Sequence, residues 1–347
     1  MQTEGSSNRI IAIKQRLRAS ISKGANTVSL VSIIIVNWNG AEVLPKCLES
    51  LFKLNHKSIE IIVVDNGSTD DSINIINKIC DDKAKVVRLE KNIGFSAGVN
   101  TGFENSAGDV FALLNNDMVV EPSWLDQPLE LLKDPAVGIV SCRQMNYYER
   151  DKVDGLYHRI PKELVLTPFG SGRVYCEDVC FSKPGYVMSA NGGSMVIRAE
   201  VVKAIGGFDA DFFGYMEETD FCLRAFLRGW RCVYAPDAVV YHKDGFSFKK
   251  NRGKQYYYRE RNRVWYLYKN IPLWDIIKRL PYILIMELRV IRVFIIKAKN
   301  PLLYFKARCD AFAVLGRYRK IRKESIALFK EKRAEFYCFE KNIKVDL

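Results

Sequence analysis

The chain has 347 residues, 48% of them hydrophobic, so it is long enough for one large globular α/β core with an additional region. Its formal net charge of +13 is unevenly distributed: residues 243–347 hold 27 Lys and Arg against 10 Asp and Glu, whereas residues 1–242 hold 26 against 30. This composition excludes a disordered chain. The basic part indicates an anionic partner for that part alone, either a membrane surface or a nucleic acid.

The chain shows no signal for secretion or for a membrane-spanning helix. Residues 1–30 lack a continuous apolar core, which predicts a flexible or loosely helical leader and no signal peptide. The longest apolar stretch, residues 282–296, contains Glu287, Arg289 and Arg292 and is shorter than the roughly 20 uncharged residues that a spanning helix needs. The nine scattered cysteines favour a reducing cytoplasm, and we interpret Cys176 and Cys180 as ordinary loop cysteines.

From residue 31 onward, short β-branched runs alternate with longer amphipathic segments, which is typical of βαβ units around a mostly parallel sheet. We expect strands at 31–37, 59–65, 85–89 and 109–115, and helices at 42–52, 70–80 and 96–105. Further on we expect a helix near 124–133, a strand near 137–142, an irregular stretch to about 184, then a strand at 194–198, helices at 199–205 and 218–228, and a strand at 231–234. The sequence thus predicts a doubly wound, Rossmann-like α/β domain over 31–245 and a basic, aromatic-rich helical region over 246–347.

Three of the expected strands end in polar or aromatic residues: Asn37-Trp38-Asn39-Gly40, Asp65-Asn66-Gly67-Ser68 and Asn115-Asn116-Asp117. Ligands of open α/β sheets bind at the carboxyl ends of the strands. There an aromatic ring can stack on a base and a carboxylate can accept the imide N–H of uracil or thymine. Each motif alone is also compatible with a turn or a helix cap, but their joint occurrence favours a nucleotide site. The absence of a GxGxxG motif after the first strand and of a Walker A loop argues against a dinucleotide oxidoreductase and a P-loop protein.

Longer motifs resemble those of family 2 glycosyltransferases, especially the rhamnosyltransferase-like branch. These motifs are VSIIIVNWNG (31–40), VVDNGSTD (63–70), NIGFSAGVN (92–100), LLNND (113–117), GGFD (206–209), FFGYMEETDFCLR (212–224) and YH (241–242). The resemblance implies a GT-A fold. It also implies an inverting, metal-dependent transfer of a sugar, with rhamnose suggested, from a nucleoside diphosphate sugar to an acceptor hydroxyl. The implied setting is the assembly of a cell-surface polysaccharide or glycolipid.

The resemblance also assigns a nucleotide-sugar site, with Asp65 at the base, Trp38 as the aromatic near it and Asn116 at the ribose. The full set implied is Val36, Trp38, Asp65, Asn92, Gly94, Asn100 and Asn116.

The metal and the base are implied in the same way. Asn115-Asn116-Asp117 takes the place of the metal-binding DxD motif, which makes Asp117 the main carboxylate on Mg²⁺ or Mn²⁺. His242 matches a position that completes the metal shell in some members. Glu218 matches the usual general base, with Glu217 and Asp220 as alternatives. These three acids are also compatible with a plain solvated helix start.

The basic region interleaves Lys and Arg with Tyr and Trp over residues 249–269, a mixture suited to a membrane interface. On a helical wheel Arg289, Arg292 and Lys299 fall within about 80° of one another, leaving an apolar arc interrupted only by Glu287. We expect a cytoplasmic protein peripheral to the inner face of the plasma membrane, with an anionic membrane surface and a glycan or lipid-linked acceptor as partners. Helices that pack on the catalytic domain or on another subunit of an oligomer are the alternative.

Two other functions fit the sequence less well. No nucleic acid is expected as a partner, because the sequence holds no recognised binding motif. A non-catalytic sugar-nucleotide-binding protein or membrane-surface scaffold would retain Trp38 and Asp65 without the metal acid or the base. Because Asp117 and Glu218 are both present, we expect an enzyme.

Overall fold

The computed structural model describes residues 30–175, 182–243 and 252–340. Its centre is a ten-stranded mixed sheet in the order β10-β12-β6-β11-β4-β1-β2-β3, with β5 paired to β12 and β7 to β6, beside a small sheet of β8 and β9. The strands are β1 Val31–Asn37, β2 Ile59–Asp65, β3 Ala84–Arg88, β4 Val110–Leu114, β5 Met118–Val120, β6 Val137–Asn146, β7 Val153–Gly155, β8 Tyr157–Arg159, β9 Thr167–Phe169, β10 Gly185–Val187, β11 Ser194–Arg198 and β12 Arg231–His242.

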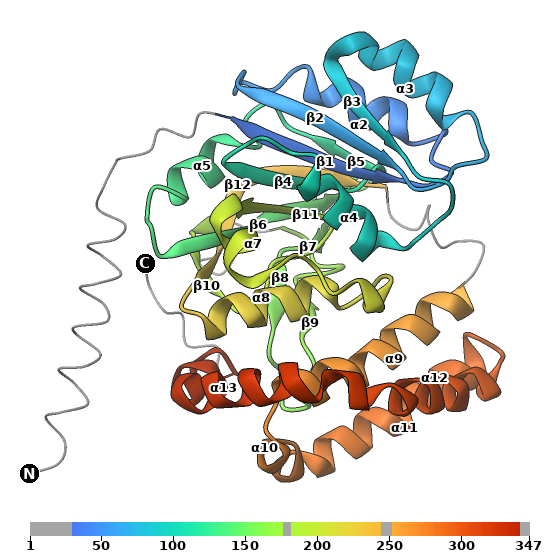
Figure 1. Cartoon of the computed structure of the whole chain (residues 1–347), viewed down its shortest axis with the longest axis vertical. Coiled ribbons are helices and arrows are strands. Elements are labelled where there is room, and N and C mark those ends of the chain that lie inside the picture. The colour runs from blue at the N-terminus through green and yellow to red at the C-terminus, as the bar shows by residue number, and fades with distance from the viewer. Residues whose placement is uncertain (1–29, 176–181, 244–251, 341–347) are drawn as a thin grey trace, which may run out of the picture.

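Helices cover both faces of this sheet and extend beyond it (Figure 1). The α-helices are α2 Leu44–Leu51, α3 Ser72–Cys80, α4 Phe95–Glu104, α5 Asp126–Leu131, α7 Ala199–Ile205, α8 Glu217–Leu227, α9 Arg252–Asn270, α10 Leu273–Lys278, α11 Leu280–Ile296, α12 Pro301–Ala313 and α13 Arg319–Glu340. Short 3-10 turns occur at Asp81–Lys83, Ala210–Phe212 and Leu315–Tyr318.

The strands β3, β2, β1 and β4 are parallel and form one half of the sheet. Burial of β1 and β4 on both faces accounts for their almost continuous apolar sequence. The side chains of α2, α3 and α5 pack on one face, and those of α4, α7 and α8 pack on the other. This arrangement leaves the carboxyl ends of the parallel strands and the loops after them to build a site.

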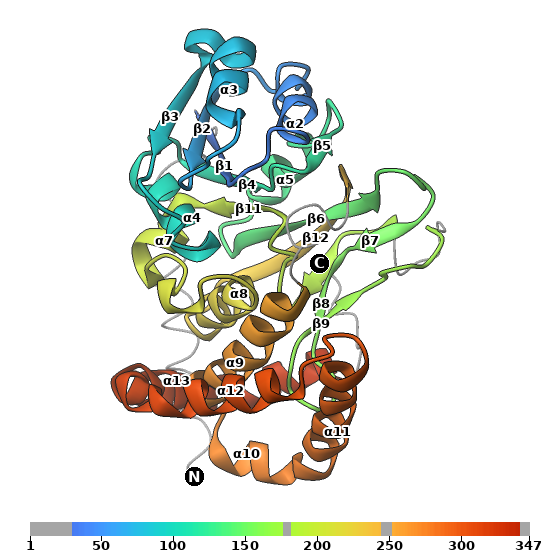
Figure 2. The ribbon, with the colours of Figure 1, turned by 90° about the vertical axis from the view of Figure 1, so that its right-hand side faces the viewer.

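The C-terminal helices do not form a separate core. Trp265 and Tyr266 of α9 and Phe336 of α13 are buried in one cluster with Leu223 and Phe226 of α8. Figures 1 and 2 show α9 to α13 gathered on one side of the molecule, beyond α8 and away from the parallel strands. The helix that carries the candidate base therefore packs on the sheet with one face and on the C-terminal helices with the other.

The expected fold class, a doubly wound α/β domain with a C-terminal helical extension, is confirmed. The strand bounds at 31–37, 59–65 and 194–198 are those expected, whereas β12 runs eight residues further than the expected 231–234. Short strands β7 to β9 occupy part of the stretch expected to be irregular. The predictions for residues 1–29, for Cys176 and Cys180 and for residues 244–251 lie outside the described residues. In the described part of the chain, no helix is long and apolar enough to cross a membrane.

Candidate active site

The first part of the site lies where β1 and β2 end. Asn37 and Asp65 are register partners, so Trp38 directly follows one strand and Asp65 ends its neighbour. Asp65 is buried: Asn37 Nδ2 donates to its Oδ1 at 3.2 Å, and the backbone N–H of Ser68 donates to its Oδ2 at 3.2 Å. Trp38 keeps 47% of its surface exposed, and Val36 in β1 is half-buried. The structure thus places a fixed carboxylate and an accessible aromatic ring at the same sheet edge.

The loop before α4 is held by Asn66. Its Oδ1 accepts the N–H of Ile93 at 2.9 Å, and its Nδ2 donates to the carbonyl of Gly94 at 3.0 Å. Asn92 Oδ1 accepts the N–H of Gly94 at 2.9 Å. Gly94 has φ +93°, and a Cβ there would lie 2.6 Å from the carbonyl oxygen of Phe213. Asn92 and Gly94 therefore shape the loop, and their predicted contact with a nucleotide stays a prediction.

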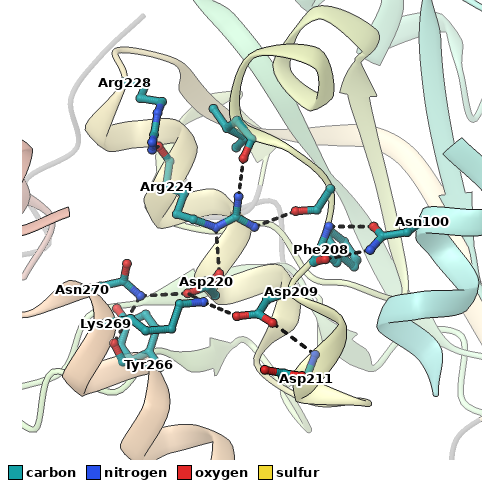
Figure 3. Close-up of polar contacts among 12 residues, drawn as sticks. Asn100, Phe208, Asp209, Asp211, Asp220, Arg224, Arg228, Tyr266, Lys269 and Asn270 are labelled. Carbon is teal, nitrogen blue, oxygen red and sulfur yellow. Dashed lines mark hydrogen bonds and ion pairs between the residues drawn. The ribbon is translucent and has the colours of Figure 1, made fainter. Parts of the chain in front are cut away.

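Asn100 has a structural role that the sequence did not indicate. Its Nδ2 donates to the Phe208 carbonyl and its Oδ1 accepts the Phe208 N–H, both at 2.8 Å (Figure 3). This pair of bonds ties α4 to the GGFD segment. Because both ends of the amide are engaged there, Asn100 positions the chain, and its predicted nucleotide contact is untested.

The turn between β4 and β5 carries the candidate metal acid. Asn116 Nδ2 donates to Asn37 Oδ1 at 2.8 Å, so this turn is joined to the end of β1. Gly40 allows the approach, because a Cβ there would lie 2.3 Å from both side chains. Asp117 is buried, and its Oδ1 has no hydrogen-bond partner. A buried carboxylate oxygen without a donor is costly unless a cation binds it.

His242 at the end of β12 meets this carboxylate. Its Nε2 lies 3.4 Å from Asp117 Oδ1, and its Nδ1 lies 2.8 Å from Asp154 Oδ2. Burial would lower the pKa of His242, but its polar contacts with Asp117 and Asp154 and the charges of both carboxylates outweigh it and raise the pKa to about 10. The imidazole ring of His242 is therefore positively charged when no other cation lies beside Asp117 and Asp154.

These residues fit a divalent cation. Asp117 offers an oxygen that faces His242 Nε2 at 3.4 Å without a closer donor, and His242, once deprotonated, offers that ring nitrogen. Asp154 orients the imidazole from its other side, as carboxylates commonly do for metal-binding histidines. Among the described residues, no group of three His, Cys, Asp or Glu is placed to hold a metal. Asp117 and His242 would therefore act as a partial set of ligands that the oxygens of a diphosphate could complete.

The other acids lie at the start of α8. Glu218 packs against Gly192, and the N–H of Asn115 donates to the carbonyl of Gly193 at 2.9 Å, so one Gly-Gly segment separates Glu218 from the metal-acid turn. Burial and the neighbouring charge of Glu218 raise the pKa of Glu217 well above its usual value. Glu217 Oε2 is buried without a hydrogen-bond partner. Glu217 is therefore shifted toward its neutral form beside Glu218.

His158 stands behind Glu218. Its Nδ1 lies 3.0 Å from the carbonyl oxygen of Ala190 and 3.8 Å from Glu218 Oε1. Burial lowers the pKa of His158 in spite of the Glu218 charge, so the ring is neutral at physiological pH. A neutral ring at this position does not neutralise the candidate base.

The segment before α8 has an unusual backbone held by α9. Phe213, Tyr215 and Met216 all have positive φ, between 65° and 72°. The buried Asn262 Nδ2 donates to the carbonyls of Phe212, Gly214 and Tyr215 at 2.8 to 2.9 Å. Left-handed conformations of non-glycine residues persist only where the surroundings enforce them. Asn262 is such a constraint, and it comes from the C-terminal region.

Asp220, one turn further along α8, anchors the same helix (Figure 3). It accepts hydrogen bonds from Arg224 at 2.8 Å and Asn270 at 2.9 Å and pairs with Lys269 at 2.9 Å. Lys269 also pairs with Asp209 at 2.5 Å. Burial would raise the pKa of Asp220, but these partners lower it to about 2. With its oxygens engaged in this way, Asp220 does not fit the role of alternative base.

The sequence did not indicate Asp154, His158 or Asn262. Asp154 lies 88 residues before His242, and Asn262 lies 47 residues after Tyr215. No local pattern marks such pairs. The only available signal for His158 was that it is one of three histidines in the chain.

Comparison with known proteins gives the class. The family model described as "Glycosyl transferase family 2" matches residues 32–206. The chain belongs to this family. A glycosyltransferase of unstated function from Haemophilus influenzae is 28% identical over 239 residues, covering 68% of this chain and 70% of that protein. The O-antigen biosynthesis protein RfbC of Myxococcus xanthus is 25% identical over 231 residues, but the match covers 62% of this chain and only 17% of that protein.

Solved structures agree on the fold. The mannosyltransferase PcManGT from Pyrobaculum calidifontis, in complex with GDP-Man and Mn²⁺, has a TM-score of 0.55 at 16% identity and is matched over 94% of this chain and 93% of that one. S. aureus TarS 1-349 in complex with UDP-GlcNAc has a TM-score of 0.53 at 16% identity, over 88% and 91%. At this identity the similarity establishes the GT-A fold alone.

Proposed function

We propose that the chain is an inverting, metal-dependent transferase that moves a sugar from a nucleoside diphosphate sugar to an acceptor hydroxyl. The observation that carries the proposal is the buried Asp117 carboxylate facing His242, separated by one Gly-Gly segment from Glu218. The name of the M. xanthus relative supports a role in assembling a cell-surface polysaccharide or glycolipid. Rhamnose is the sugar suggested by the sequence motifs.

In this proposal Glu218 takes the proton of the acceptor hydroxyl as that oxygen attacks the anomeric carbon. A single displacement of this kind inverts the configuration. Glu217, neutral because of its raised pKa, donates a hydrogen bond to the substrate. A bound Mg²⁺ or Mn²⁺, held by Asp117 and His242, would supply Lewis-acid stabilisation of the departing diphosphate.

The donor's nucleoside would lie at the ends of β1 and β2. Trp38 stacks on the base and Asp65 accepts its imide N–H, while Asn116 reaches the ribose from the neighbouring turn. The placement of these three groups at one sheet edge supports this arrangement. Because PcManGT was solved with a guanine nucleotide and TarS with a uracil nucleotide, the base is a question for experiment.

A donor screen with the purified protein tests the proposal. Release of nucleoside diphosphate is scored across sugar nucleotides, with and without acceptor lipid extract. One donor should support release that depends on the acceptor, and Glu218→Gln should lower that rate by roughly 10² to 10⁴ while leaving nucleotide binding intact. Glu331→Gln, at an exposed glutamate of α13, is the control and should leave the rate unchanged. Binding of a sugar nucleotide without any turnover would instead indicate a non-catalytic binding protein.

A further inference from the structure

The exposed apolar side chains of this protein are concentrated in one region. Thirteen of the eighteen large hydrophobic side chains that are exposed among the described residues lie between residues 273 and 312, on α10, α11 and α12. Single exposed hydrophobic residues are normal on a protein surface, but a concentration of this kind marks an interaction site. Figures 1 and 2 place α10 and α11 at the edge of the molecule farthest from the parallel strands.

The inner face of α11 is occupied by the protein's own core. Ile283, Val290 and Phe294 are buried. Glu287 also points inward: its Oε2 accepts from Arg308 at 2.8 Å and from the Tyr304 hydroxyl at 2.6 Å, and its Oε1 pairs with Arg263. The one acid that interrupts the apolar arc in the sequence is therefore neutralised inside the protein.

The outer face of α11, which we call the α11 face, consists of Leu284, Ile285, Leu288, Ile295 and Ile296. Each of them is about half exposed or more, and Leu288 reaches 68%. On a helical wheel they fall within an arc of about 120°. This is the geometry of an amphipathic helix whose apolar side has no partner within the described chain.

The charged side chains at the α11 face are cations: on the helical wheel Arg292 falls inside the arc of about 120° and Arg289 about 20° beyond its edge. Arg289 and Arg292 are exposed on the same side of the helix, and Lys297 and Lys299 are exposed at its end. Between residues 273 and 309 the only acids are Asp275 and Glu287. Asp275 is buried and bonded to Arg333 and Tyr337, and Glu287, 23% exposed, is paired with Arg263 and Arg308. The acid of α12, Asp310, is paired with Lys306. The surface of α10 and α11 is consequently apolar and cationic.

We propose that the α11 face binds the interface of an anionic lipid bilayer, with α11 lying in the plane of the membrane. Isoleucine and leucine enter the boundary between headgroups and acyl chains, while Arg289 and Arg292 meet lipid phosphates. A second copy of this chain fits poorly, because two α11 faces would bring four arginines together without an acid. The proposal deepens the proposed function, since a transferase held in this way acts on acceptors at the membrane surface.

The test is co-flotation of the full chain with phosphatidylcholine vesicles with or without phosphatidylglycerol, over a salt series. We expect binding only to the anionic vesicles, weakening as salt rises. Each cation near an anionic surface contributes about fivefold, so Arg289→Gln/Arg292→Gln should reduce partitioning roughly thirtyfold. Leu284→Gln/Leu288→Gln should also reduce it. Arg319→Gln/Lys320→Gln on α13 and Phe52→Gln directly after α2, all exposed but outside the α11 face, are matched controls and should bind as the unchanged protein does.

Three results would overturn the proposal. These are the absence of binding to anionic vesicles at low salt, equal binding by the α11-face variants and their controls, and a dimer in solution that Leu284→Gln/Leu288→Gln dissociates. Nucleoside diphosphate release in detergent solution is measured with the same variants. If the unchanged protein releases no nucleoside diphosphate in that assay, the proposed function is contradicted, whereas the vesicle result is unaffected.

Discussion

Lys269→Met tests whether the C-terminal region fixes the helix that carries the candidate base. Lys269 is buried between Asp209 and Asp220, and methionine keeps most of its volume while removing its charge. Complete loss of a partner from a buried ion pair costs about 3–5 kcal/mol. Because Arg224 and Asn270 still bond Asp220, we expect the lower end of that range.

The pKa of Asp220 gives a second measure of the same effect. A fall from the ordinary 3.8 to about 2 corresponds to about 2 kcal/mol of stability. Since the folded state lowers this pKa, the stability is fully present above pH 3.8 and is lost as the pH falls through about 2. In Lys269→Met the pKa rises toward or above the unfolded value, so acid unfolding should begin at a higher pH.

The assay is urea unfolding at neutral pH and at a series of acidic pH values, followed by tryptophan fluorescence. Lys133→Met, which removes an exposed lysine paired with Glu130, is the control and should leave the midpoint unchanged. The nucleoside diphosphate release rate of Lys269→Met is measured without urea, at a temperature where the variant is folded. This rate should fall because the start of α8 is less firmly placed. An unfolding free energy and an acid transition equal to those of the unchanged protein would refute the reasoning.

Two further predictions concern the site. Asp117→Ala should sharply raise the Mn²⁺ or Mg²⁺ concentration that gives half-maximal turnover, because it removes the main protein carboxylate. A metal titration measures this concentration. Full activity of the unchanged protein in excess EDTA would contradict the prediction. Asn262→Ala should cost about 1–3 kcal/mol of stability, since it removes the side-chain donor to the carbonyls of Gly214 and Tyr215, while that of Phe212 keeps Arg261. It should also lower kcat more than it raises donor KM, and a variant with unchanged kcat would show that the left-handed segment needs no such support.

The parallel half of the fold was predictable because its signals are local. Val31–Asn37 and Ile59–Asp65 are continuous β-branched runs, and each ends in polar residues at the bound predicted from the sequence. Strands of three residues, such as β8, bury too few side chains to produce a period, so the stretch that contains them was expected to be irregular. The family and the fold class followed from the motifs.

The sequence motifs indicated the candidate site residues themselves, but not the residues that hydrogen-bond or ion-pair with them. Asp117 and His242 are neighbours because Met118 pairs with His242 across β5 and β12, a contact that the motifs allowed us to infer only by resemblance. The partners that set their electrostatics, Asp154 above all, come from segments without a motif. Glu287 shows the opposite error: on a helical wheel it interrupts the apolar arc, whereas in the structure it faces Arg263 and Arg308.

The support of the 212–216 segment by Asn262 has a consequence for the synthesis of this protein. A chain leaves the ribosome from its N-terminus, so the sheet and α8 emerge before α9 and α13. Until those helices emerge, the left-handed segment lacks Asn262 as a donor to its carbonyls, and the core cluster around Leu223 and Phe226 is incomplete. The chain up to the end of β12 therefore contains Glu217 and Glu218 without the residue that holds the segment before them.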